Sequence, residues 1–160
     1  ALLADLAAQA RQQEREEAFF ENIPVETGSG LPDIVLPEVG GNNVALSSLK
    51  GKVVVLDFVV YNAEYSPAHN IELNTIYNKY KSQGMEVYQV SLDSDEHFWK
   101  ISAANLPWIT VRDGASVNSS LLSRYNVREI PTSFIIDREG DIVSRLENLS
   151  QLSEELNKVL

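Results

Sequence analysis

The chain has 160 residues, with 23 acidic and 13 basic side chains, a formal net charge of -10 and 44% hydrophobic residues. This length predicts one folded domain with one core, and the acidic surface would repel nucleic acid and anionic lipid. Because cysteine is absent, these residues cannot form disulfides, thiolate nucleophiles, iron–sulfur clusters or Cys-ligated zinc.

Residues 1–23 are predicted to form a helix, since the segment lacks Gly and Pro and is rich in Ala, Leu, Gln, Glu and Arg. Its apolar side chains include Leu2, Leu3, Leu6 and Phe20. They leave two roles open, packing on the chain's own domain or acting as a connector or self-association helix that forms a homodimer. Residues 24–160 are predicted to form the folded domain.

Strand and helix patterns alternate through the rest of the chain. Short extended pieces flank the turn at Gly40 and Gly41. Strands are predicted at 52–60, 85–92, 108–111, 132–137 and 141–146, and helices at 66–83, 95–105, 119–125 and 150–160. The two most apolar strands are typical of strands buried on both faces. The pattern therefore predicts an α/β fold with a central sheet covered by helices on both sides.

Three segments resemble thioredoxin-like proteins. Residues 52–80 resemble their strand, active-site turn and following helix. Residues 85–108 resemble the strand, helix and Leu-Pro-Trp element of the TlpA-like (AhpC/TSA-like) branch, and residues 125–145 resemble its proline turn and final hairpin. The resemblance covers about residues 31–160 and implies a thioredoxin-like fold with a mixed central sheet.

The redox motif of that family is missing. The positions of its Cys-x-x-Cys motif are occupied by Ala63, Glu64, Tyr65 and Ser66. Thiol–disulfide exchange needs a thiolate, so this sequence predicts a redox-inactive domain that acts as a binding or structural module rather than an enzyme. The alternative of a thioredoxin-family oxidoreductase would follow from the resemblance alone.

Ser66 and His69 suggest a second alternative, an enzyme with non-thiol chemistry. A serine hydroxyl needs a base to become a nucleophile, and His69 follows three residues later. A structural role is favoured, in which Ser66 is the N-cap of the helix, Pro67 its first residue and His69 an exposed side chain. Asp57, inside an apolar strand, is interpreted as an inherited buried acid with a structural role.

Two further groups are candidates for binding. Tyr61, Tyr65 and Trp108 would form a contact patch if their rings are exposed, or would fill space left by the family's usual tryptophan and sulfurs. Ile130 and Pro131 resemble the family's cis-proline turn, which implies a docking edge for an extended protein or peptide partner.

No cofactor or metal site is expected. Asp93, Asp95 and Glu96 are interpreted as charges at a helix start rather than calcium ligands. No apolar run reaches the roughly 18 to 20 residues of a membrane-spanning helix. The TlpA-like resemblance implies a periplasmic or cell-envelope location, and the first residue, Ala1, suggests a processed chain with a signal or lipid anchor upstream.

Overall fold

The computed structural model describes residues 33–160 of the chain. The predicted N-terminal helix at residues 1–23, and both of its alternative roles, lie outside the described residues. Within residues 33–160, no helix is both long enough and apolar enough to cross a membrane.

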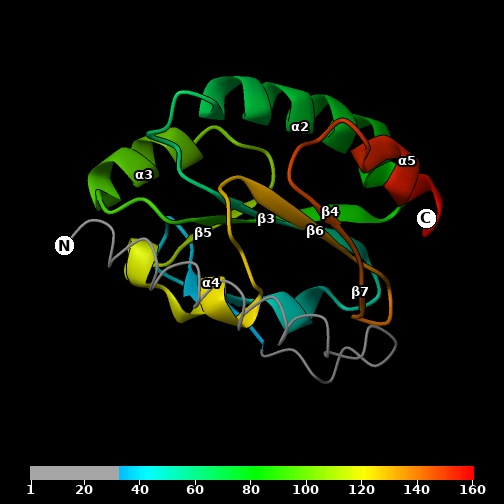
Figure 1. The fold of residues 1–160 in the computed structure, drawn as a ribbon, viewed down its shortest axis with the longest axis horizontal. Helices are drawn as coiled ribbons and strands as arrows, with labels where there is room; N and C mark the ends of the chain where they lie inside the picture. The colour runs from blue at the N-terminus through cyan, green and yellow to red at the C-terminus, as the bar shows by residue number, and fades with distance from the viewer. Residues whose placement is uncertain (1–32) are drawn as a thin grey trace, which may run out of the picture.

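A mixed five-stranded sheet forms the centre of the described chain (Figure 1). Its strand order is β5-β4-β3-β6-β7, in which β3 and β4 are parallel, β4 and β5 are parallel, and β6 is antiparallel to both β3 and β7. The strands are β3 (Val53–Val59), β4 (Met85–Ser91), β5 (Ile109–Arg112), β6 (Thr132–Ile136) and β7 (Ile142–Leu146). A separate antiparallel pair is formed by β1 (Val35–Pro37) and β2 (Asn43–Ala45).

Helices cover both faces of this sheet, as predicted. On one face lie α2 (Ser66–Tyr80), α3 (Glu96–Ala103) and α5 (Leu152–Asn157), and on the other lie α4 (Ser120–Arg124) and the 3-10 turn η1 (Leu46–Leu49) (Figure 1). Two further 3-10 turns, η2 (Lys81–Gln83) and η3 (Ser116–Asn118), end α2 and precede α4. The α/β fold class expected from the sequence is confirmed.

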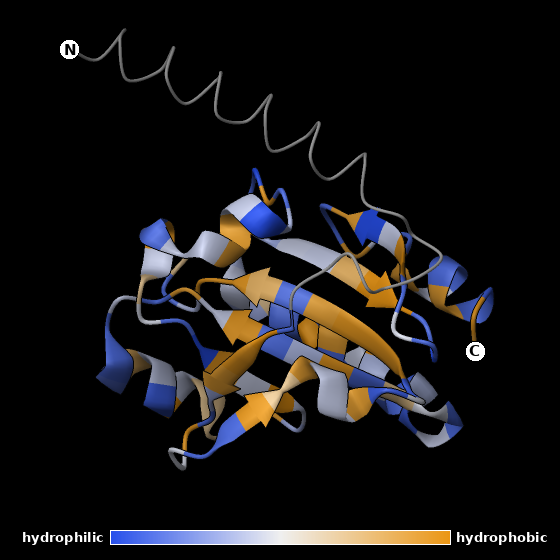
Figure 2. Ribbon diagram, turned by 90° about the horizontal axis from the view of Figure 1, so that it is seen from below, coloured by the Kyte–Doolittle hydropathy of each residue, from blue (hydrophilic) through white to orange (hydrophobic). Residues whose placement is uncertain are grey.

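The apolar composition of β3 explains its central position. Every residue of β3 is buried, and alternate side chains serve the two layers of the core. Val53 and Val55 pack with α2 and α5, whereas Leu56 and Phe58 pack with α4. Figure 2 shows the hydrophobic residues concentrated in the strands.

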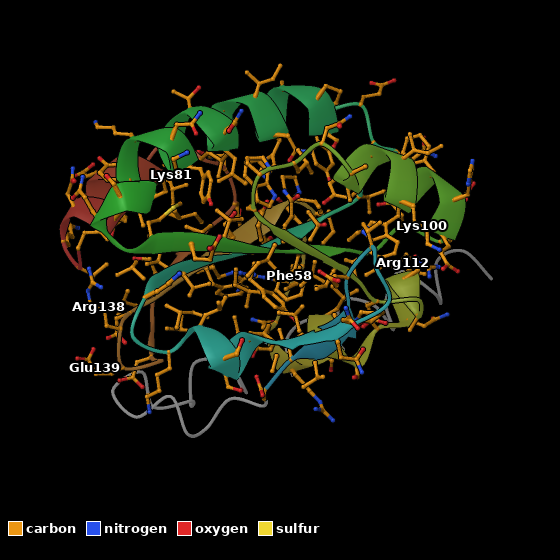
Figure 3. All side chains as sticks on the ribbon, turned by 180° about the vertical axis from the view of Figure 1, so that it is seen from behind. Phe58, Lys81, Lys100, Arg112, Arg138 and Glu139 are labelled. Carbon is orange, nitrogen blue, oxygen red and sulfur yellow. The ribbon has the colours of Figure 1, made fainter. Side chains whose placement is uncertain are left out.

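Most lysine and arginine side chains lie outside this core. Figure 3 shows Phe58 in the middle of the molecule and Lys81, Lys100 and Arg138 at its periphery. Arg138, in the turn between β6 and β7, donates to the carbonyl oxygens of Gly51 at 3.1 Å and Gln83 at 2.9 Å. It therefore ties this turn to the segments that precede β3 and β4.

Candidate functional site

The segment between the end of β3 and the start of α2 contains residues 63–66, which the resemblance described above assigns to the Cys-x-x-Cys positions. Within it the Ser66 N–H donates to the Ala63 carbonyl at 3.1 Å, and the Tyr65 hydroxyl accepts from the Val60 N–H at 2.8 Å. Glu64 is exposed, Ala63 and Tyr65 are half-buried, and Ser66 is buried. Burial raises the pKa of Tyr65 to about 12, so its phenol stays neutral at physiological pH. We call residues 63–66 the former active-site turn.

Ser66 is not the N-cap of α2, contrary to the prediction. The N-cap is Tyr65, whose backbone is already helical at φ -70° and ψ -21°, and no side chain caps this end of the helix. A capping serine needs an extended backbone so that its oxygen can fold back onto the N–H groups of the first turn. Ser66 is itself the first helical residue, so its hydroxyl does not serve that role.

Asp57 lies beneath this turn and is fully buried in β3. Its Oδ1 accepts from the Ser133 hydroxyl at 2.8 Å. Its Oδ2 accepts from Gln89 Nε2 at 2.9 Å and contacts His69 Nε2 at 2.8 Å. A buried carboxylate is costly unless such partners surround it, and here each oxygen has at least one.

His69 is buried against Asp57, which corrects the prediction that it is exposed. Its side chain is 7% exposed, because the first turn of α2 packs this residue onto β3. Burial disfavours the charged imidazolium, but the hydrogen bond and negative charge of Asp57, with a further contribution from Glu72, outweigh it and raise the pKa of His69. The other histidine, His97, is exposed on α3.

Gln89 of β4 connects Asp57 to two aromatic side chains. Its Oε1 accepts from the Tyr61 hydroxyl at 2.6 Å and from Trp108 Nε1 at 2.9 Å, while its Nε2 also donates to Asn70 Oδ1 at 2.9 Å. We call Asp57, His69, Gln89, Ser133, Tyr61, Trp108 and Asn70 the buried polar network.

Tyr61 and Trp108 are not exposed, so they do not meet the condition for a contact patch with Tyr65. Tyr61 and Trp108 are each only 6% exposed, because Gln89 gives their polar atoms a partner inside the protein. For these two rings the space-filling alternative describes the structure. Burial, and then the negative charges of Asp57 and Asp93, raise the pKa of Tyr61.

The donors in this network determine which nitrogen of neutral His69 carries a proton. An indole N–H can only donate, so Trp108 fixes Oε1 of Gln89 as the acceptor and Nε2 as the donor. Gln89 therefore donates to the Asp57 carboxylate, which accepts from His69 Nε2–H as well. Neutral His69 then has a basic, unprotonated Nδ1 on the side away from Asp57.

Asp93 has a structural role that the sequence did not reveal. The sequence predicts it at an acidic helix start together with Asp95, and Asp95 does cap α3 by accepting from the Phe98 N–H at 3.1 Å. Asp93 instead is buried and accepts from the backbone N–H groups of Tyr61 at 2.8 Å and Asn62 at 3.1 Å. It holds the chain that leads from β3 into the former active-site turn.

The turn before β6 also approaches the network. The Ile130–Pro131 peptide bond is cis, and both residues are half-buried. Ser133, two residues later, donates to Asp57. No group of three or more potential metal ligands occurs among residues 33–160.

Gln89, Asn70 and Ser133 are site residues that sequence reasoning missed. A glutamine within the apolar strand Met85–Ser91 was the available signal, since a buried amide needs partners. Asn70 and Ser133 carry no comparable signal, because polar residues are ordinary near a helix start and at the end of a strand.

Comparisons with known proteins extend over most of the chain. A model of the AhpC/TSA family matches residues 27–145. The thiol-disulfide oxidoreductase ResA of Geobacillus kaustophilus is 31% identical over 128 residues, covering 78% of this chain and 71% of the relative. ResA of Bacillus cereus is 28% identical over 150 residues, covering 88% and 83%. A thioredoxin-like protein from Bacteroides vulgatus, solved in solution, is 51% identical with a TM-score of 0.74, covering 80% and 84%. The fold is therefore thioredoxin-like.

Proposed function

Because the chain belongs to the AhpC/TSA family and has no cysteine among its 160 residues, we propose that it is a redox-inactive, thioredoxin-like binding module. One observation carries this proposal. The former active-site turn reads Ala63, Glu64, Tyr65 and Ser66, and the polar groups beneath it bond to one another without any sulfur. The scaffold is kept while the atoms that exchange disulfides are gone.

The surface of the module offers a place for a partner. Glu64 is exposed, and Tyr65, Ile130 and Pro131 are half-buried. In this proposal a protein or peptide partner contacts the former active-site turn and docks along the edge at Ile130 and Pro131. A periplasmic or cell-envelope location, with a signal or lipid anchor upstream of residue 1, belongs to the same proposal and is supported by the TlpA-like resemblance.

Insulin reduction tests the loss of chemistry. We expect the wild-type chain to reduce insulin no faster than buffer with dithiothreitol alone, because it supplies no thiolate. The double variant Ala63→Cys/Ser66→Cys is the positive control, since it restores two sulfurs to the former active-site turn. Wild-type activity above the buffer rate would overturn the proposal, whatever the control shows.

A pull-down from envelope extract tests the binding surface. The bait is the wild-type chain beside Glu64→Ala/Tyr65→Ala, with Glu139→Ala/Glu154→Ala as a control that changes two exposed residues elsewhere. We expect partners to be retained by the wild type and the control but lost by the first variant. Equal recovery of partners from all three baits would show that the former active-site turn is not part of the binding surface.

The Asp57–His69 pair favours one second candidate, a non-thiol hydrolase. The 2.8 Å contact leaves His69 with a basic Nδ1, and Ser66 lies one turn earlier on α2. If this chemistry operates, hydrolysis of p-nitrophenyl acetate should fall at least about tenfold in both His69→Gln and Ser66→Ala. Unchanged rates in these variants would eliminate it.

A further inference from the structure

Two side-chain contacts join the start of α2 to β3 and the residue that follows it. The Tyr65 hydroxyl accepts from the Val60 N–H at 2.8 Å, and His69 Nε2 lies 2.8 Å from Asp57 Oδ2. The rings of Tyr65 and His69 also meet edge to face, with their centroids 6.1 Å apart. The former active-site turn and the first turn of α2 are therefore held to the sheet partly through His69.

Of these two contacts, only that of His69 changes charge near neutral pH. Burial raises the pKa of Tyr65 to about 12 and raises the pKa of Tyr61 as well, so both phenols stay neutral. The charges that act on His69 are those of Asp57 on β3 and Glu72 on α2, and both are negative. Protonated His69 is therefore attracted by its surroundings, and neutral His69 loses that attraction.

The other neighbours of Asp57 cannot replace the missing charge. Gln89 on β4 and Ser133 on β6 donate to its carboxylate at 2.9 and 2.8 Å, but an amide and a hydroxyl are uncharged. When His69 is neutral, no member of the buried polar network carries a charge opposite to that of Asp57. A buried charge without an ionic partner is costly, and water that reaches it lowers the cost.

The start of α2 is the part of this site that can open most easily. Gln89 and Ser133 belong to strands β4 and β6, which pair with β3 on either side. His69 instead belongs to the first turn of a helix whose N-cap, Tyr65, makes no side-chain capping hydrogen bond. Uncapped helix ends open at a lower free energy than paired central strands. Opening at this turn would hydrate Asp57 while the sheet stays intact.

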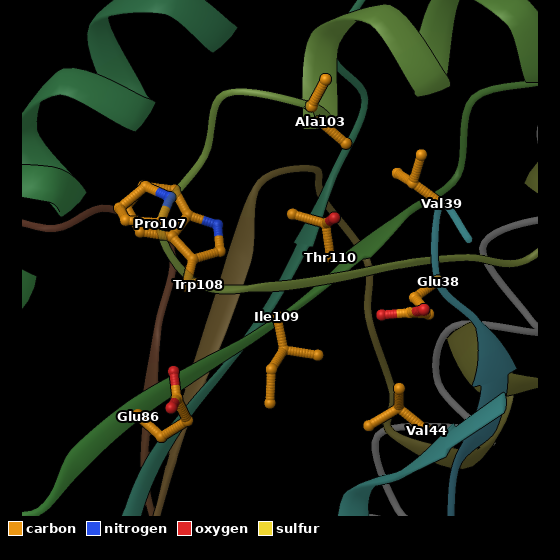
Figure 4. A pocket seen from close by; sticks show the side chains of 10 residues that line it. Glu38, Val39, Val44, Glu86, Ala103, Pro107, Trp108, Ile109 and Thr110 are labelled. Atoms are coloured by element: carbon orange, nitrogen blue, oxygen red, sulfur yellow. The ribbon is translucent and has the colours of Figure 1, made fainter. Parts of the chain in front are cut away.

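The opposite end of the buried polar network is anchored on the sheet. Trp108 directly precedes β5 and donates to Gln89 Oε1 at 2.9 Å, and its ring is 6% exposed. Figure 4 shows Trp108, with Glu38 and Glu86, among the side chains that line a groove beside β5. The indole N–H of Trp108 is therefore a reference signal within the same network, away from the first turn of α2.

We propose that protonation of His69 controls a local opening of the former active-site turn and the first turn of α2. With His69 protonated, these residues stay closed on β3. When His69 loses its proton, they open locally and Asp57 becomes hydrated, while the rest of the domain stays folded. The closed state binds the proton more tightly than the open state, in which His69 has its ordinary pKa of 6.5, so the opening constant must rise with pH above this value. This switch does not require a bound partner, so it does not depend on the proposed function.

Native-state hydrogen exchange of the full 160-residue chain tests the proposal. Amide exchange rates, measured by NMR at about pH 5.5 and about pH 8.5 and divided by the intrinsic rates, give an opening constant for each amide. We expect the opening constants of the Val60, Ser66 and His69 amides to rise roughly threefold to tenfold between the two pH values, because a charge-assisted hydrogen bond is about twice as strong as a neutral one. The Trp108 indole N–H should stay as protected as the amides of β4.

A matched pair of variants identifies the group that titrates. His69→Gln keeps a hydrogen-bond donor toward Asp57 but cannot be protonated, so its opening constants at the two pH values should agree within about twofold. His97→Gln changes a histidine outside the buried polar network and should keep the wild-type response. Circular dichroism confirms that each variant is folded. NMR signals of the His69 ring nitrogens follow its titration in the wild type, which needs no substitution.

Either of two results would overturn the proposal. One is a set of wild-type opening constants for the Val60, Ser66 and His69 amides that does not change with pH. The other is equal opening constants in the first turn of α2 and in β4, because the chain would then open only by unfolding as a whole. Insulin reduction and the pull-down do not measure this opening, so its failure is distinguishable from a failure of the proposed function.

Discussion

At the scale of single residues, the buried Asp57–His69 pair is the feature most open to measurement. The side chain of His69 is 7% exposed, and its pKa is raised because Asp57, and more weakly Glu72, outweigh the cost of burial. The pKa of His69 is higher in the folded state than the value of 6.5 that it has in the unfolded chain. Below pH 6.5 the protonated side chain therefore contributes its full stabilisation of the fold. That contribution is lost as the pH rises through the raised pKa.

We therefore predict that His69→Gln lowers the free energy of unfolding by about 1 to 3 kcal/mol at about pH 5.5, and by less at about pH 8.5. Urea denaturation at the two pH values measures the difference. His97→Gln, which removes the exposed histidine of α3, is measured beside it as a control for the loss of one histidine. A cost of His69→Gln that grows with pH would show that the sign is wrong.

The sequence could predict Asp57 but not its partners. A carboxylate within an apolar strand requires satisfied hydrogen bonds, which identifies Asp57 as structural from composition alone. Which residues satisfy it depends on how α2, β4 and β6 are arranged around β3, since His69, Gln89 and Ser133 come from those three elements. Tertiary packing of this kind has no local signature in the sequence.

At the scale of secondary-structure elements, two polar residues predicted at helix starts, Asp95 and Ser66, have different roles. Asp95 has an extended backbone, with φ -90° and ψ 105°, and accepts from the Phe98 N–H at 3.1 Å. Ser66 is already helical and does not cap α2. Aspartate and serine are both common at helix starts, so residue type does not distinguish the two positions. The backbone conformation at the start of each helix determines which side chain can cap it, and the sequence does not reveal that conformation.

We predict that Asp95→Ala lowers the free energy of unfolding by about 1 kcal/mol, whereas Ser66→Ala costs less than about 0.5 kcal/mol. Each variant is compared with the wild type by urea denaturation at one pH. The two substitutions both remove a polar side chain at a helix start, so each is the control for the other. Equal costs would mean that the Ser66 hydroxyl does stabilise the first turn of α2.

At the scale of the whole molecule, the order of the elements could be predicted because each has a local signature. The continuous apolar run at 52–60 indicates β3, the strand pattern at 85–92 indicates β4, and turn residues at 138–140 indicate the final hairpin. The groove beside β5 could not be predicted, because Glu38 and Glu86 are brought to it by strand register. The place of β5 at the end of the described sheet likewise depends on strand order.

The net charge of -10 gives a last prediction at this scale. Ion pairs at the surface of the described residues include Glu96–Lys100 and Glu155–Lys158. Such pairs contribute little to the free energy of unfolding. Repulsion among the excess acidic side chains should therefore dominate the surface electrostatics. Because salt screens this repulsion, raising NaCl from about 10 mM to about 150 mM should raise the Tm by roughly 2 to 4 °C. Calorimetry measures the shift.

The control variant Glu139→Gln/Glu154→Gln removes two acidic side chains, so the net charge becomes -8 and the rise in Tm with salt should be smaller. A Tm that falls as salt is added would show that attractive pairs outweigh the repulsion.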